Sequence, residues 1–431
     1  MGEPTGPVSR NPLARSNPLA PIYVCVFLFS AGEAMLHVLV PPYLAIELGV
    51  GPGVVGAVLG VFAVAALVAR LPVGAIYTSR RARKLLLLGG GLSAIAFALV
   101  PLVRGVFWFG ALMAVDGLGW SIATTAQLAA LAAARPPGLS TSWAMGWYSG
   151  FIGLGHTVAG ATAGFFADTF GFSPSFFTLA AVVAVATFVI VAALGRLDLS
   201  GAVNAKTTKR PRVRLREALG HVAEMPAVVW AGVLIMIYIN LVNGVFNSFH
   251  PLLVLPAGLS LTQIGVLNTC RAWGSSTVRL GSGLVFSRTD GRWMTTPLLL
   301  LGAASLFLLP AVRSSFPLQV PLFLAVGVSR GLLRVTGSAE AFDGVGEDER
   351  KHGMTAALLH AGLDFGKLIG PLTGGVLAEA FGLAAMFRLI PVLLLAAYLP
   401  LDLAARRSMA ARRAISSEGR PSATRNPSDA N

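Results

Sequence analysis

The chain has 431 residues, of which 55% are hydrophobic and only 12% are charged, and its mean hydropathy is +0.73. A soluble domain averages about 25% charged residues, so this chain has too few charges to cover a water-exposed surface. The composition excludes an ordinary soluble protein and indicates that lipid is the main solvent.

Twelve apolar stretches follow one another along the chain. A helix needs about 20 such residues to cross the hydrocarbon core of a bilayer. The stretches cover residues 21–45, 53–77, 84–103, 107–131, 142–168, 174–195, 226–250, 261–287, 294–312, 316–340, 352–379 and 383–405. We therefore predict an all-α membrane protein with 12 transmembrane helices.

The net charge of +14 is concentrated in alternate loops. Basic residues crowd the loop before residue 85 and the stretch 196–225, whereas the loops on the other side hold only Arg104 and Arg313. Basic loops stay in the cytoplasm, so both termini are predicted there, in a multi-pass protein of the cytoplasmic (inner or plasma) membrane. Topology and contact with anionic lipids account for the charge, and we expect no nucleic-acid partner.

The polar stretch 196–225 divides the chain near its midpoint. We interpret it as a basic cytoplasmic linker between an N-terminal six-helix bundle, 21–195, and a C-terminal six-helix bundle, 226–405. The terminal segments 1–20 and 406–431 are predicted to be disordered cytoplasmic tails.

The two halves of the sequence are related. Arg70-Leu71-x-x-Gly74 is echoed by Arg279-Leu280-x-x-Gly283, 209 residues later, and Gly164 matches Gly375 at an offset of 211. A nearly constant offset that spans six helices, an even number, gives both halves the same orientation in the membrane. This pattern predicts a parallel repeat.

With this repeat, the sequence resembles the major facilitator superfamily over roughly residues 20–405. That family carries a Gly-x-x-x-Asp-x-x-Gly-Arg-Arg type of motif between helices two and three, although Thr78 stands here where the acid is expected. The residues that match this motif and its companion between helices eight and nine are Gly74, Arg80, Arg81, Arg83, Gly283 and Arg292. The resemblance implies two parallel six-helix bundles, secondary transport of a small-molecule substrate by alternating access, and gating roles for these residues.

The eleventh helix contains a Gly/Pro pattern, which is typical of the fifth helix of the family's antiporters and favours export. Its members are Gly366, Gly370, Pro371 and Gly374. Glycines at every fourth residue form a smooth face on which helices pack closely in lipid. This face is either a surface on which the two halves rock or a static packing face. From the resemblance, we also expect Asp168 at the cytoplasmic end of helix five, where it would meet the basic loop and latch an outward-facing state.

Polar residues inside spanning helices are costly and mark functional sites. Several share one face of a helix, such as Glu33 with His37, and Asp364 with Lys367, which could pair with each other. The candidates for the substrate and ion pathway are Glu33, His37, Asp116, Trp120, Asn240, Asn243, Asn247, Arg271, Arg330, Arg334, Asp364 and Lys367.

The acids Glu33 and Asp116 belong to the first half, while Arg271, Arg330 and Arg334 belong to the second. We predict that Glu33 or Asp116 carries a coupling proton, and that the arginines bind an anionic group of the substrate. The alternative is that these charges form fixed ion pairs.

Other functions have little support in the sequence. Histidines lack an HxxxH-type spacing, and there is no Gly-x-x-x-x-Gly-Lys-[Ser/Thr] motif for ATP. We expect a monomer that is not an enzyme and has no metal or cofactor. A non-transporting membrane receptor or assembly factor on the same fold is the competing interpretation, and it predicts that loop mutations matter more than mutations of buried charges.

Overall fold

The computed structural model describes residues 19–76, 80–134, 141–194, 225–286, 291–345, 349–398 and 400. Within these ranges lie twelve long helices. They are α1 (Ala20–Ile46), α2 (Pro52–Ile76), α3 (Ala82–Leu99), α4 (Val106–Ala134), α5 (Thr141–Phe170), α6 (Phe172–Leu194), α8 (Ala227–Val254), α9 (Leu261–Phe286), α10 (Gly291–Leu308), α11 (Phe316–Asp343), α12 (Glu349–Phe381) and a last helix, Leu383–Tyr398. The predicted twelve-helix architecture is confirmed.

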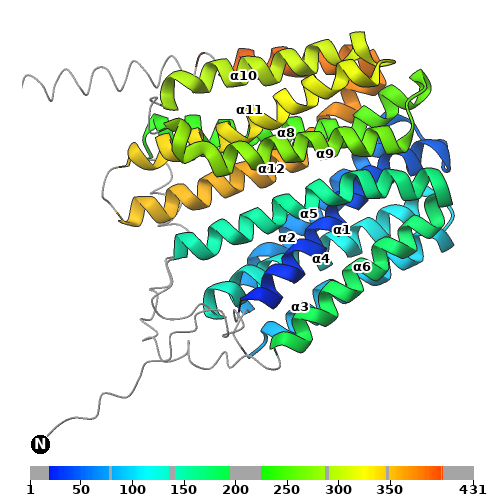
Figure 1. Ribbon diagram of the computed structural model, residues 1–431, viewed down its shortest axis with the longest axis horizontal. Helices are drawn as coiled ribbons and strands as arrows, with labels where there is room; N and C mark the ends of the chain where they lie inside the picture. Colours follow the sequence, from blue (N-terminus) through cyan, green and yellow to red (C-terminus); the bar gives the residue numbers. More distant parts are fainter. Residues whose placement is uncertain are drawn as a thin grey trace, which may run out of the picture.

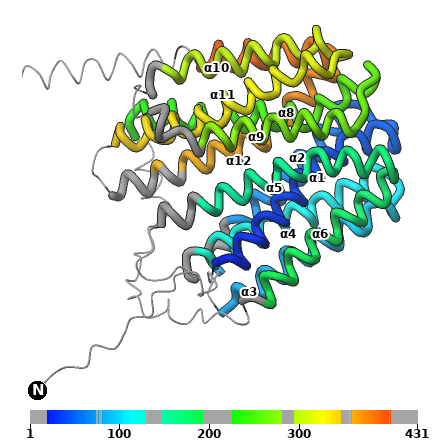
Figure 2. The backbone as a smooth tube through the Cα atoms, in the orientation of Figure 1, coloured from blue at the N-terminus to red at the C-terminus, as the bar shows by residue number. Residues whose placement is uncertain are grey.

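The helices form two bundles that lie side by side, as Figures 1 and 2 show. The N-terminal half contains α1 to α6, and the C-terminal half contains α8 to α12 with the last helix. The predicted linker, except Met225, and nearly all of the two predicted tails lie outside the described residues. Their assignment stays a prediction.

Lipid is the solvent that suits the outer surface of these bundles. Eight of the helices in the described part are long and apolar enough to cross a membrane. Large apolar side chains such as Leu87 on α3, Phe188 on α6 and Phe307 on α10 are exposed, whereas the spanning windows of α1 and α8 are each 72% buried. The central positions of α1 and α8 bring their polar residues to the middle of the molecule.

The molecule has two distinct ends. At the basic end, α3 begins beside the exposed side chains of Arg80, Arg81, Arg83 and Lys84. The opposite end carries the turns from α1 to α2 and from α8 to α9, on the right in Figure 1. The halves meet mainly through α5 with α9 and α2 with α12. Their ribbons lie close at the opposite end and diverge toward the basic end.

Candidate functional site

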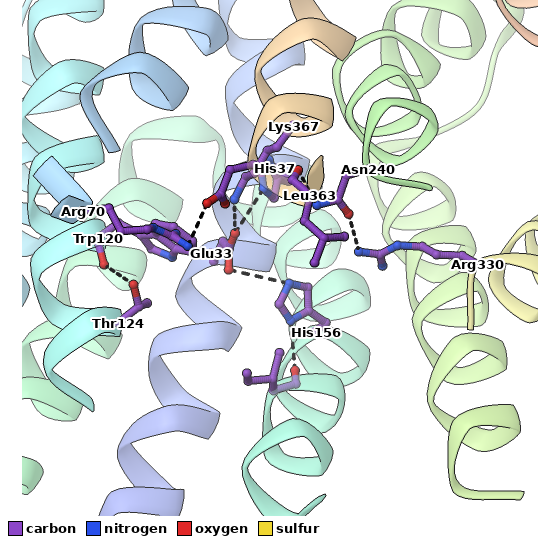
Figure 3. A network of polar contacts seen from close by, with 12 residues as sticks. Glu33, His37, Arg70, Trp120, Thr124, His156, Asn240, Arg330, Leu363 and Lys367 are labelled. Carbon is purple, nitrogen blue, oxygen red and sulfur yellow. Dashed lines mark hydrogen bonds and ion pairs between the residues drawn. The ribbon is translucent and has the colours of Figure 1, made fainter. Parts of the chain in front are cut away.

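An ion pair joins the two halves within a network of polar contacts (Figure 3). The ammonium of Lys367 on α12 lies 2.6 Å from Oε1 of Glu33 on α1. The Glu33 side chain is only 12% exposed, and that of Lys367 is 24% exposed. A charge removed from water to this extent needs a partner, and here the partner comes from the other half.

Two histidines complete the surroundings of the Glu33 carboxylate. Nε2 of His37, one turn along α1, lies 3.7 Å from Oε1. Nε2 of His156 on α5 lies 3.8 Å from Oε2, while its Nδ1 lies 2.9 Å from the carbonyl oxygen of Ile152. A donor Nδ1–H in that contact would leave Nε2 as the free ring nitrogen. Nε2 then carries a proton toward Oε2 only when the imidazole is charged, so each carboxylate oxygen has a titratable ring as its neighbour.

A second ion pair crosses the halves beside the first. Nη1 of Arg70 on α2 lies 3.1 Å from Oδ2 of Asp364 on α12. The expected pairing of Asp364 with Lys367 is therefore wrong, because each residue finds a partner in the N-terminal half. The spacing correctly predicts that the two side chains lie on one face of α12. That face lies against the N-terminal half, where Asp364 pairs with Arg70 and Lys367 pairs with Glu33.

Aromatic rings support these cations. The Lys367 ammonium lies 4.2 Å from the centre of the Trp120 ring and 5.4 Å from that of Phe62. The Arg70 guanidinium lies 5.5 Å from the Trp120 ring, distances at which a cation is attracted to the ring face. These rings and the Arg70, Asp364 and Lys367 side chains line a small pocket. The Trp120 ring thus lies against both cations of the two ion pairs.

The C-terminal half surrounds its arginines with neutral groups. Arg271 on α9 is 8% exposed and donates to side-chain oxygens of Asn243, at 2.6 Å, Asn247, and Asn268, at 3.0 Å. Nη2 of Arg330 on α11 lies 3.4 Å from Oδ1 of Asn240. Among the described residues, no carboxylate lies within 4.0 Å of either guanidinium. Both arginines therefore keep a positive charge that amide oxygens solvate and do not neutralise.

Two candidates, Asp116 and Arg334, form no hydrogen bond or ion pair with Glu33 or Lys367 in the described part of the chain. Asp116 is 1% exposed, and its Oδ2 is buried with no hydrogen-bond partner in the described part of the chain. It lies near Ser93, whose hydroxyl donates to its backbone oxygen at 3.5 Å, so it belongs to the packing of α4 against α3. Arg334 lies one turn beyond Arg330 on α11.

The three predicted gating glycines of α12 pack within their own half. A Cβ added at Gly366 or Gly370 would collide with backbone of α8, and one at Gly374 would lie 2.6 Å from the ring of Phe249. Both α8 and α12 belong to the C-terminal half, so the structure favours the static packing face over the rocking surface. Pro371 contacts both halves, because an added Cβ at Gly56 of α2 would collide with its carbonyl oxygen and one at Gly244 of α8 would lie 3.0 Å from its ring.

Of the other predicted gating residues, Gly74 lies in α2, Gly283 in α9 and Arg292 in α10, with side-chain surroundings outside the described structure. The expectation for Asp168 is wrong. Asp168 lies at the opposite end, where its carboxylate accepts hydrogen bonds from the start of α9. Helix five begins near the basic end, so its last turn cannot reach the basic loop.

Sequence analysis missed four residues of the site: Arg70, Phe62, His156 and Asn268. Arg70 had a signal, since a repeated arginine inside an apolar helix is costly without a partner. His156 and Asn268 carried the same signal as the histidine and asparagines selected above, whereas Phe62 carried none, because a phenylalanine in a helix is compatible with ordinary packing.

The sequence matches the Major Facilitator Superfamily over residues 22–356 and 239–425. This chain belongs to the Major Facilitator Superfamily. It is therefore a multi-pass integral membrane protein of a family of secondary transporters, which move small molecules across a lipid bilayer and are generally not enzymes.

Solved structures of superfamily transporters have the same fold. The crystal structure of the nucleoside transporter NupG has a TM-score of 0.71 at 12% identity, over 90% of this chain and 99% of that one. A bacterial homologue of the human lysosomal transporter Spinster, inward-facing and unoccupied, has a TM-score of 0.67 at 17% identity, over 92% and 98%. Its occupied form gives 0.68 at 14% identity, over 90% and 96%. No curated protein sequence matches the chain. At these identities the likeness establishes the fold and not the substrate.

Proposed function

We propose that this superfamily member is a proton-coupled transporter that exports a small anionic solute by alternating access. The observation that carries the proposal is the ion pair between Glu33 and Lys367, which joins the two halves at 2.6 Å. A transporter couples a proton to movement if the proton changes a contact that differs between its states. This ion pair is such a contact.

Protonation of Glu33 would remove the negative member of the pair. Lys367 would then keep only its contacts with the rings of Trp120 and Phe62, and the link between α1 and α12 would weaken. His37 and His156 lie within 4 Å of the carboxylate and offer routes by which the proton arrives and leaves. In this mechanism Glu33 is the proton carrier and Asp116 is not, because Asp116 forms no hydrogen bond or ion pair with Glu33 or Lys367 among the described residues.

The charge of the C-terminal half supports an anionic substrate. Arg271 and Arg330 have neutral asparagine partners, so an arriving carboxylate, phosphate or sulfonate would meet two cations without first displacing an acid. Arginine forks bind such oxyanions through two parallel hydrogen bonds. Asparagine amide groups, whose oxygens already accept from Arg271, have N–H donors left for the same anion.

The proposed orientation in the membrane and the proposed direction of transport rest on separate features. The exposed basic residues at the start of α3 support a cytoplasmic basic end, with both chain termini on that side of the cytoplasmic membrane. Export rests on the antiporter-like Gly/Pro pattern of α12 alone. We further propose that one chain suffices for transport, because the two halves complete the site between them.

A ligand screen followed by transport measurements tests the anion site. Purified protein is heated with carboxylates, phosphates, sulfonates, and neutral and cationic compounds, and binding is detected as a rise in apparent stability. We expect anions alone to stabilise the protein, and Arg271→Gln to abolish the effect. Arg388→Gln, an exposed arginine on the last helix, is the matched control. Equal stabilisation of the Arg271→Gln variant would refute the anion site.

Proton coupling is tested in liposomes with the anion that the screen selects. We expect Glu33→Gln to retain exchange of substrate for substrate but to lose its response to a pH gradient, whereas Glu47→Gln, an exposed acid at the end of α1, keeps both. A full response to the gradient in Glu33→Gln would exclude Glu33 as the carrier. The competing receptor function predicts that neither variant changes a flux, because no flux exists.

A further inference from the structure

Two carboxylates at the opposite end of the molecule each hold a helix that belongs to the other half. Asp168, near the end of α5 in the N-terminal half, binds the start of α9. Glu379, near the end of α12 in the C-terminal half, binds the start of α2. These contacts lie where the ribbons of the two halves come together (Figure 2).

Asp168 completes the N-terminus of α9. Its Oδ1 accepts from the backbone N–H of Leu261 at 3.1 Å, and its Oδ2 accepts from the N–H and the hydroxyl of Thr262, both at 2.6 Å. The next N–H, of Gln263, is taken by the hydroxyl of Ser260. A helix leaves its first N–H groups without internal partners, and two of those of α9 are bound by a side chain from the other half.

Glu379 binds the N-terminus of α2 in the same way, with fewer hydrogen bonds. Its Oε2 accepts from the N–H of Gly53 at 3.1 Å. Pro52 precedes it and has no N–H to give. An added Cβ at Gly51 would lie 3.0 Å from Oε2 and one at Gly53 would lie 3.2 Å from it, so glycine permits this close approach.

The two contacts are copies of each other in the internal repeat. Glu379 stands 211 residues after Asp168, and Thr262 stands 209 residues after Gly53, which are the offsets that relate the two halves. Each carboxylate also lies at the positive end of a helix dipole, where negative charge is favoured. A contact present in both copies, and crossing between the halves each time, points to a role in how the halves move.

We propose that Asp168 and Glu379 are twin clamps that hold the opposite end closed and set how often it opens. Alternating access requires this end to part at some stage of the cycle, and both clamps must then break. The Asp168 clamp has three hydrogen bonds and the Glu379 clamp has one, so Asp168 contributes more. This inference rests on the transporter fold and is independent of the substrate, the proton and the direction proposed above.

A distance measurement across the opposite end tests the clamps without a substrate. Spin labels are placed at Arg104→Cys and Arg313→Cys, exposed positions in equivalent turns of the two halves. Cys25 and Cys270 are replaced by alanine, and the full chain is studied in lipid nanodiscs by electron–electron double resonance. The measured quantity is the ratio of long-distance to short-distance populations.

We expect Asp168→Asn to raise this ratio about tenfold and Glu379→Gln about fivefold, the scale of charge-assisted bonds at a helix N-terminus. The double variant should combine both effects. Both carboxylates are exposed, so high salt should move the unmodified chain in the same direction by screening. Glu47→Gln is the matched control and should leave the ratio unchanged, because this exposed acid at the same end binds neither helix start in the described structure.

A purely structural role of the two carboxylates predicts a different result in the distance measurement. If Asp168 only caps α9 as part of a static fold, Asp168→Asn lowers thermal stability and leaves the distance ratio unchanged. An unchanged ratio in both single variants overturns the proposal, as does a larger effect for Glu379 than for Asp168. If Asp168→Asn fails to fold, the distance ratios of Glu379→Gln and of the unmodified chain at high salt still test the proposal. A failed anion screen leaves this result unaffected.

Discussion

Truncating Lys367 to alanine is the most direct test of the central ion pair. At 2.6 Å and an effective dielectric constant of 20, two unit charges attract by about 6 kcal/mol before the cost of desolvation. Removing one partner leaves Glu33, which is 12% exposed, with two histidines at 3.7 and 3.8 Å. Loss of one member of a buried pair costs about 3–5 kcal/mol. We expect a loss of this size in the free energy of unfolding.

The assay is denaturant unfolding in detergent micelles, followed by tryptophan fluorescence, in a double-mutant cycle. Lys367→Ala and Glu33→Gln are each destabilised, whereas the double variant no longer holds an unpaired charge. We expect a coupling energy of about 2–3 kcal/mol, typical of residues in direct contact. Lys84→Ala, an exposed lysine at the start of α3, should change stability by less than about 0.5 kcal/mol.

Additive losses in the double variant would refute this reasoning. Additivity would mean that the two charges contribute separately, through packing or through other partners, and that their contact does not join the halves. The proposed coupling of a proton to movement would then lose its structural basis, because breaking the pair would change nothing that the halves share.

Three further outcomes follow from the packing and the charges. Gly164→Val places a side chain against the carbonyl at the start of α9 and should cost about 1–3 kcal/mol in unfolding experiments, whereas Gly150→Val on the same helix meets open space and should not. Trp120→Phe should retain proton-coupled flux and Trp120→Leu should lose most of it in liposome assays, because only an aromatic face attracts the Lys367 ammonium. Arg271→Lys should weaken anion binding about tenfold in a titration, since a point charge cannot reproduce the two-pronged fork.

Much of the fold could be predicted because lipid imposes a simple rule on the sequence. Each helix must be apolar for about 20 residues, so helices such as α5 (Thr141–Phe170) begin and end within a few residues of the expected 142–168. The repeat offsets were equally informative. They predicted two related bundles, and the twin contacts of Asp168 and Glu379 follow the same offsets.

The types of residue in the site could be predicted from the sequence, but the partner of each residue could not. Buried charges such as Glu33 and Lys367 stand out in apolar helices, whereas their pairing depends on how α1 and α12 approach across the halves. Spacing along one helix reveals only a shared face, which is why Asp364 was expected beside Lys367 and not beside Arg70. Asp168 was misplaced for a different reason. The family resemblance suggested the cytoplasmic end for Asp168. The alternation of helix directions along the chain puts the last turn of α5 at the opposite end.

The repeat also explains how two related halves came to differ in charge. An added Cβ at Gly117 of α4 would collide with the carbonyl oxygen of Phe62, and one at Gly327 of α11 would collide with that of Arg271. These are the same helix contact in two copies, so Phe62 and Arg271 occupy equivalent positions on α2 and α9, 209 residues apart.

The same equivalence relates Trp120 to Arg330, three residues beyond each of those glycines. One half therefore has an aromatic pair where the other has an arginine pair. The aromatic pair of the first half holds a cation, Lys367, that comes from the second half and is neutralised by an acid. The arginine pair, Arg271 and Arg330, has no such counter-charge among the described residues. A substrate that supplies the missing negative charge would complete the second copy as Lys367 completes the first, and this asymmetry is the strongest physical argument for an anion.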